Sequence, residues 1–247
     1  MNFEPRARFE LSRVFSRTFG ALGPNFGAIF LLAVAFSYLP QAVSEGLVIN
    51  FQVISPDDVL RQFLATSELL LIYAAFGLGL GIGLTFVADR TARGLSVSIQ
   101  DCLGQISRQF FAFLLLETIM TLCLVFSAFL LVVPAIMLSM AWAAAAPVLV
   151  LEGKRPTDSL IRSADLTRGY RWPIFGVTLL FGLITAVPSF VLSLTTRNVT
   201  PFINLVVIMP MFNSVAQVLN LLLAVAIYHE LRFVKEGSSS PVADVFA

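Results

Sequence analysis

Residues 109–151 read QFFAFLLLETIMTLCLVFSAFLLVVPAIMLSMAWAAAAPVLVL and hold one charged side chain, Glu117, in 43 positions. A bilayer core about 30 Å thick requires about 20 apolar residues of helix. The stretch is therefore too long for one membrane span and has the right length for two. Because Pro134 divides it, we predict a helical hairpin that crosses a membrane over 109–132 and again over 135–151.

The composition of the whole chain agrees with a membrane protein. Of its 247 residues 57% are apolar and 13% are charged, whereas soluble domains have about 45–50% and about 25%. This excludes a soluble enzyme and a disordered chain. The net charge of +1 argues against a nucleic-acid partner. Cys102 and Cys123 form neither a disulfide framework nor a metal-binding spacing, so no cofactor and no metal are expected.

Four further apolar stretches have the length of a span. They cover residues 26–43, 69–88, 173–194 and 203–228. With the hairpin they predict an all-α integral membrane protein with six transmembrane helices, in a single membrane domain over 1–236. Residues 237–247 are expected to form a disordered tail.

The distribution of basic residues predicts the orientation of these spans. Of the 16 Lys and Arg residues, 14 lie in segments that six spans place on one side, and only Arg61 and Arg197 lie on the other. Since cytoplasmic loops carry the excess of Lys and Arg, both termini are predicted in the cytoplasm. The expected location is the bacterial inner membrane.

Amphipathic patterns precede the first, third and fifth spans. Apolar residues recur at helical spacing within 9–22, 92–110 and 156–168. Such segments are typical of helices that lie in the membrane interface. We therefore expect three hairpins, each preceded by a cytoplasmic interfacial helix. The pattern is open to two interpretations, a true threefold repeat or a shared organisation only.

The segment around the fifth span contains the candidate lipid contacts. The residues expected at the headgroup level are Arg155, Arg162, Arg168, Arg171 and Trp172. Each basic residue near an anionic membrane contributes about 1 kcal/mol to binding. Membrane lipids, anionic ones among them, are therefore the expected partners. The alternative is that these residues only fix the orientation of the spans, as basic residues of cytoplasmic loops generally do, and bind no particular lipid.

Glu117 is the most unusual residue of the predicted spans. It lies eight residues into the third span, roughly 12 Å along the helix, where a charge costs at least ~2.5 kcal/mol. The candidate partners lie on one face of the sixth span and are Asn213, Gln217 and Asn220. Glu117 is expected to be either a polar clasp between the third and sixth spans or the proton or cation site of a transporter.

The second span contains four glycines at alternate positions, Gly77, Gly79, Gly81 and Gly83. They form two overlapping pairs of small residues four positions apart. Pairs of this kind let another helix approach closely. We expect them at helix–helix contacts, within the chain or between copies.

Three stretches resemble a known family. They are FELSRVFSRTF over 9–19, LEGKRP with SLIRSADLTRG over 151–169, and YHELRFVKEG over 228–237. They look like the bacterial proteins named after the membrane domain of glycerophosphoryl diester phosphodiesterase. The matching positions are Glu152, Gly153, Pro156, Arg162, Ser163, Gly169, Arg232, Glu236 and Gly237. The resemblance implies six helices and no catalysis, because the phosphodiesterase barrel of the namesake enzymes is absent.

No arrangement of residues typical of an enzyme occurs in the sequence. His229 is the only histidine, so a pair of metal-binding histidines is excluded. We therefore expect a non-catalytic inner-membrane protein, a lipid-associated scaffold or accessory component with a basic cytoplasmic face. The alternative is a small-solute or ion transporter that uses Glu117.

Overall fold

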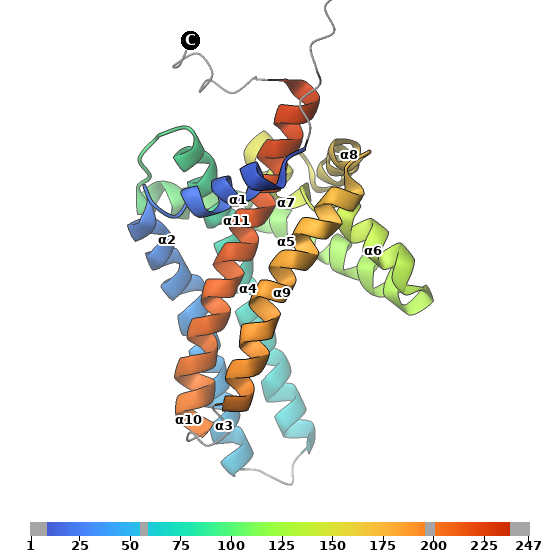
Figure 1. Cartoon of the computed structure of the whole chain (residues 1–247). Coiled ribbons are helices and arrows are strands. Elements are labelled where there is room, and N and C mark those ends of the chain that lie inside the picture. The colour runs from blue at the N-terminus through green and yellow to red at the C-terminus, as the bar shows by residue number, and fades with distance from the viewer. Residues whose placement is uncertain (1–8, 55–58, 196–200, 238–247) are drawn as a thin grey trace, which may run out of the picture.

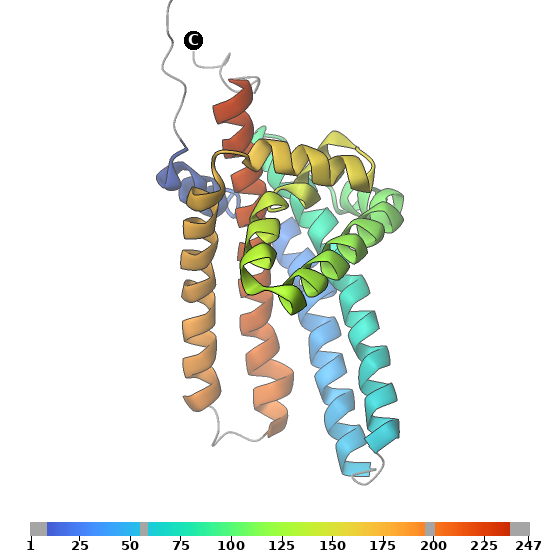
Figure 2. The ribbon, with the colours of Figure 1, turned by 90° about the vertical axis from the view of Figure 1, so that its right-hand side faces the viewer.

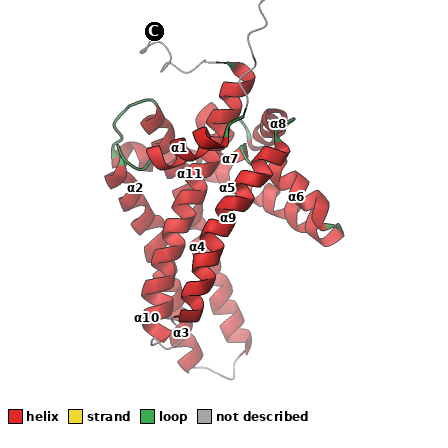
Figure 3. Ribbon diagram, viewed as in Figure 1, coloured by secondary structure: helices red, strands yellow, loops and turns green. Residues whose placement is uncertain are grey.

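The computed structural model describes residues 9–54, 59–195 and 201–237, with side chains for 9–47, 73–195 and 202–237. All regular elements in these ranges are helices (Figure 3). They are α1 (Leu11–Gly20), α2 (Phe26–Ala33), η1 (Val34–Tyr38), α3 (Leu39–Ile54), α4 (Val59–Ala92), α5 (Ile99–Leu130), α6 (Val132–Ala141), α7 (Ala145–Glu152), α8 (Pro156–Thr167), α9 (Arg171–Thr195), α10 (Pro201–Ile203), η3 (Asn204–Ile208) and α11 (Met209–Glu236). Apart from Gly237, the expected tail lies outside the described residues.

Five helical segments of the described chain are long and apolar enough to cross a membrane. They are Phe26–Leu47, Ile99–Leu130, Val132–Glu152, Arg171–Thr195 and Asn204–Glu236. The prediction of an all-α chain with membrane-spanning helices is confirmed at this level. The remaining predicted span, 69–88, lies within α4, where side chains are described only from Tyr73 onward.

The long helices form a bundle with a cap of short helices at one end. Figures 1 and 2 show that α3, α4, α9 and α11 run along the bundle, while α1 and α8 lie across one end of it. The C-terminal turns of α11 reach the same end. We call it the basic end, because α1, α8, the last turns of α11 and the loops before and after α8 contain most of the described Lys and Arg residues.

The short helix α8 has the boundaries that its sequence predicts. Pro156 occupies the first helical position, where its missing N–H has no partner to lose. Beyond the C-terminus Gly169 has φ +90°, a left-handed conformation that glycine adopts without steric cost. The predicted segments 156–168 and 9–22 thus correspond to α8 and α1.

The expected interfacial helix before the third span does not exist as a separate element. Ala92 ends α4, and Leu95 lies in the loop that follows. The rest of the 92–110 pattern forms the first turns of α5, which continues unbroken to Leu130. Residues 105–130 contain neither proline nor glycine, so nothing in the sequence ends the helix before the apolar stretch.

Helices α5 and α6 form the predicted hairpin, but its geometry differs from the expectation. Leu131, in extended conformation with φ −162° and ψ 138°, joins them. Pro134 consequently lies in the first turn of α6 and not at the turn itself. Figures 1 and 2 show that the hairpin leaves the bundle obliquely and that its tip ends part-way along the bundle. Phe129 at this tip is 91% exposed.

The expected fourth span, 135–151, is broken in the structure. Helix α6 ends at Ala141 and α7 begins at Ala145, with a turn over 142–144. The alanine-rich sequence favours a continuous helix, whereas the structure interrupts this segment with a turn while keeping it long and apolar enough to cross a membrane. The hydrogen bonds that compensate for the break come from α8 and are described below.

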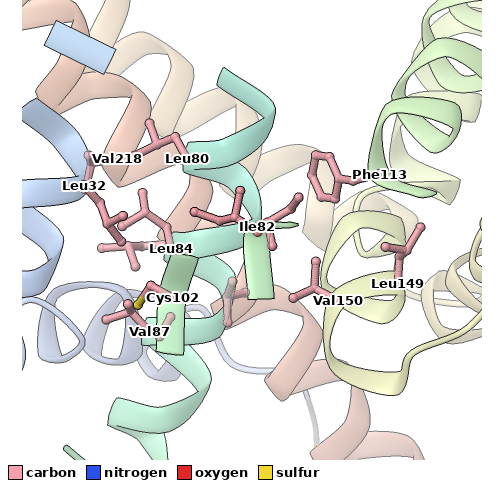
Figure 4. Close-up of a cluster of buried hydrophobic side chains, with 14 of the residues drawn as sticks. Leu32, Leu80, Ile82, Leu84, Val87, Cys102, Phe113, Leu149, Val150 and Val218 are labelled. Carbon is pink, nitrogen blue, oxygen red and sulfur yellow. The ribbon is translucent and has the colours of Figure 1, made fainter. Parts of the chain in front are cut away.

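Helix α4 lies at the centre of the packing. Its side chains Leu80, Ile82 and Leu84 are fully buried. Figure 4 shows this cluster and its neighbours from four other helices. The labelled neighbours are Leu32 of α2, Cys102 and Phe113 of α5, Leu149 and Val150 of α7, and Val218 of α11.

The glycines of α4 lie where other helices come close. A Cβ atom at Gly79 would be 2.7 Å from the Phe36 ring, and one at Gly81 would be 3.0 Å from Phe113. Gly83 faces Leu32 at 3.2 Å, and Gly77 faces Gln217 at 3.7 Å. These glycines therefore serve contacts within the chain, between α4 and helices on several sides.

Candidate functional site

A fully buried carboxylate joins α1 to α11 at the basic end. Glu230 of α11 has no exposed side-chain surface. Its Oε1 atom accepts hydrogen bonds from Nη2 of Arg13 at 2.8 Å, from Nε of Arg13 at 3.0 Å and from the backbone N–H of Glu10 at 3.2 Å. Nη1 of Arg17 lies 3.2 Å from Oε2. The helix α1 is thus held on the bundle through one acid.

The pKa values of the two arginines of α1 shift in opposite directions at this site. The hydrogen bond that Arg13 donates to Glu230 has the largest effect on that guanidinium and raises its pKa. Burial lowers the pKa of Arg17, although the charge of Glu230 opposes the change. The ring of Phe233 lies 5.1 Å from the Arg13 guanidinium, within the range of a cation–π contact. Both cations are therefore anchored to α11.

A second ionic network joins α7, α8 and α11. The hydroxyl of Tyr228 donates to Oε1 of Glu152 at 3.1 Å, and Nε of Arg232 donates to Oε2 of Glu236 at 2.9 Å. Arg162 of α8 pairs with both acids, and its Nε atom lies 3.5 Å from Glu152. The network therefore contains four residues of the family resemblance, Glu152, Arg162, Arg232 and Glu236.

The remaining residues of the resemblance shape the backbone around this network. Gly153 and Gly237 have φ +62° and +75°, in the region that favours glycine. Together with Gly169 and Pro156 they delimit α7, α8 and the end of α11. These residues therefore position the helices that supply the charged side chains.

Ser163 supplies the hydrogen bonds that the break between α6 and α7 removes. Its hydroxyl donates to the carbonyl of Ala141 at 2.9 Å and accepts from the N–H of Ala144 at 3.1 Å. Thr167 of α8 also donates to the Ala141 carbonyl, at 3.1 Å. Buried backbone groups require such partners. One turn of α8 thus stabilises a discontinuous span.

A polar cluster within the bundle joins the first and last apolar helices. The hydroxyl of Ser37 lies 2.6 Å from Oε1 of Gln217 and 3.0 Å from the hydroxyl of Ser214. Ser37 belongs to the π-helical segment η1 and is fully buried. Gln217, one of the expected partners of Glu117, is therefore engaged by the first apolar helix instead.

The other residues of the expected polar cluster do not come together. Within the described residues, Glu117 has no recorded hydrogen bond and no ion pair, and it is partly buried on α5. Asn220 is exposed, and its amide donates to the Ala216 carbonyl of its own helix. Asn213 is partly buried on the same helix. The structure thus joins Gln217 to Ser37, which also bonds to Ser214, and shows no such partner for Glu117 in the described residues.

The candidate lipid contacts divide into two groups. Arg162 is engaged by Glu152 and Glu236. Arg155, Arg168 and Arg171 have no ion pair among the described residues. Trp172, next to Arg171, is 76% exposed. The arginines that remain free to contact another molecule are therefore those outside the network.

Sequence reasoning missed Glu230, although a signal for it exists. Glu230 follows the predicted sixth span and lies between apolar residues that continue its helical pattern, such as Ile227 and Leu231. An acid on the apolar face of a helix is expected to need a buried cation. In the sequence its partners, Arg13 and Arg17, do not differ from the other basic residues of the predicted cytoplasmic side.

The chemistry of the basic end is that of ion pairs and hydrogen bonds between helices. Of the described residues, no three His, Cys, Asp or Glu side chains are grouped as metal ligands. His229 lies 3.5 Å from Asp89 of α4, which is itself paired with Arg93 at 2.9 Å. Asp89 thus contacts both α11 and the end of its own helix.

Comparison with known proteins gives no relative. No family model, no curated protein and no solved structure matches the chain.

Proposed function

We propose that this chain is a non-catalytic, lipid-associated scaffold or accessory protein of the bacterial inner membrane. It has six spans in three hairpins, with both termini and the basic end in the cytoplasm. The segregation of 14 of 16 basic residues to one side supports this orientation. The resemblance to the membrane domain of glycerophosphoryl diester phosphodiesterases, a part of those enzymes separate from their catalytic barrel, supports a role without catalysis.

One observation favours a scaffold above other functions. Three acids at the basic end, Glu230, Glu152 and Glu236, hold α1 and α8 on α11. The result is a surface of short helices with a fixed position and with basic side chains left over. Such a surface is suited to contact lipid headgroups or a partner protein at the membrane.

The orientation is tested by labelling single cysteines with a membrane-impermeant maleimide. The background replaces Cys102 and Cys123 by Ala. S12C on α1 and D165C on α8 should react only in inside-out vesicles, whereas T195C at the end of α9 should react in spheroplasts. V133C at the hairpin tip should also react in spheroplasts if α5 and α6 both cross. Reaction of S12C in spheroplasts, or failure of V133C to react there, would contradict the six-span topology.

The alternative is a transporter, and one observation favours it. Glu117 is an intramembrane carboxyl without a recorded partner in the described residues, and such groups commonly belong to ion or substrate pathways. An apolar pocket on the α5–α6 hairpin is lined by Leu124, Val125, Ala128, Val132, Ala135, Ile136 and Ser139. Glu117 is not among these lining residues.

Proteoliposomes with a trapped pH indicator distinguish the two functions. A scaffold should dissipate an imposed proton gradient no faster than protein-free vesicles, and E117Q should behave identically. A proton flux that the wild-type protein supports and E117Q abolishes would contradict the scaffold and establish the transporter.

A further inference from the structure

The corner between α8 and α9 combines positive charge with exposed aromatic and apolar surface. Arg168 follows α8, and Arg171 is the first residue of α9, with Gly169 turning the chain between them. Neither arginine has an ion pair among the described residues. Asp165 is the nearest acid before them in the sequence, and its recorded contact is through its carbonyl, to Lys235.

The charge of this corner is not compensated within the described chain. The first turn of α9 contains no acidic residue, although a helix N-terminus is itself partially positive and favours an anion over a cation. The Nε atom of Arg171 is shielded from solvent and has no hydrogen-bond partner in the described structure. An external anion at this corner would compensate its positive charge.

The surface below the two arginines is apolar and continuous. Trp172 is 76% exposed, and its ring packs edge-on against Phe175 at 6.1 Å. Positions 176, 179, 183 and 187 follow Trp172 on the same face of α9 by helical periodicity, and all are exposed. Exposed tryptophans mark the headgroup level of a membrane, so this face is positioned to contact acyl chains below a headgroup.

We propose that Arg168, Arg171 and Trp172 form a binding site for the headgroup of an anionic phospholipid, with its acyl chains along α9. This inference rests on the proposed lipid association and narrows it to one site. Arg155 lies at the opposite end of α8, about 18 Å away for 12 residues of helix, which is too far to share one phosphate. Arg162 is excluded because Glu152 and Glu236 bind it.

The site is tested in the full chain by quenching of Trp172 fluorescence with brominated lipids. The background W142F leaves Trp172 as the only tryptophan. Titration into detergent solution compares brominated phosphatidylglycerol with brominated phosphatidylcholine. The anionic lipid should bind more tightly, and R168A/R171A should weaken that binding roughly 30-fold. The control R108A removes an exposed arginine of α5 that lies outside this corner, and it should retain the preference.

The site would be overturned by equal quenching of Trp172 by both lipids in the parent protein, or by an equal loss of lipid affinity in the control. Displacement of the lipid by millimolar inorganic phosphate would also overturn it, because that result would indicate a site for free phosphate. If R168A/R171A fails to fold, the single variants R168Q and R171Q replace it, each with an expected loss of roughly 5-fold. A proton flux that depends on Glu117 would refute the proposed scaffold function. If the protein still preferred the anionic lipid, the lipid site itself would not be contradicted.

Discussion

Arg13 and Glu230 stand 217 positions apart in the chain, and Nη2 of Arg13 lies 2.8 Å from Oε1 of Glu230. Through this contact an amphipathic helix at the N-terminus is fixed to the last helix of the bundle. The buried carboxylate also accepts the backbone N–H of Glu10. The position of α1 is therefore set by specific polar contacts in addition to its apolar face.

Removal of Glu230 should release α1 and destabilise the protein. E230A leaves the Arg13 and Arg17 guanidiniums without their buried partner, and breaking a buried pair costs about 3–5 kcal/mol. The measurement is reversible unfolding in mixed micelles. E10A removes an exposed carboxylate that pairs with Arg13 at 3.2 Å, and this control should change the free energy of unfolding by less than about 1 kcal/mol. Equal stability of E230A and E10A would contradict the assignment.

Replacement of Ser163 should destabilise the break between α6 and α7. In S163A the N–H of Ala144 loses its recorded side-chain acceptor, which costs about 1–3 kcal/mol for a buried group. S159A is the matched control, since Ser159 is also fully buried in α8 but bonds only to the Arg155 carbonyl of its own turn. The unfolding temperature of S163A should be well below that of S159A. The reverse order would show that α8 does not support the break.

Two glycine substitutions should change stability in opposite directions. G79A places a Cβ 2.7 Å from the Phe36 ring, and such overpacking costs about 1–3 kcal/mol. G104A meets no atom within 4 Å on α5, and alanine in an open helical position gains about 0.5–1 kcal/mol over glycine. Unfolding free energies should therefore fall for G79A and rise for G104A. A stable G79A would mean that α2–η1 and α4 are not packed as described.

Leucine at position 117 should stabilise the protein if Glu117 has no partner. The described structure records no hydrogen bond or ion pair for this carboxyl, and a charged group within a bilayer costs at least ~2.5 kcal/mol. E117L should therefore raise the unfolding free energy in bilayers, whereas T118L, next to it on the exposed face, serves as the control. Loss of stability in E117L alone would reveal a bound partner for the carboxyl.

Local features of the sequence were sufficient to predict the helical class and most helix positions. The apolar stretches 26–43, 173–194 and 203–228 fall within helices of the structure. Pro156 and Gly169 delimit α8 as expected, because the backbone restrictions of these two residue types act locally. By contrast, the pattern over 92–110 misled, since apolar periodicity alone does not distinguish a short surface helix from the start of a long one.

The helical class with membrane-compatible helices follows from local sequence, because the length of an apolar run depends only on neighbouring residues. Which polar groups meet depends on the tertiary structure. Ser37 bonds to Gln217, which Glu117 was expected to contact. Ser163 accepts a hydrogen bond at the break in an alanine-rich helix. Glu230 pairs with Arg13, 217 positions away. Each of these contacts joins segments far apart in sequence. Their energies depend on burial and hydrogen-bond geometry, which exist only once the helices have packed.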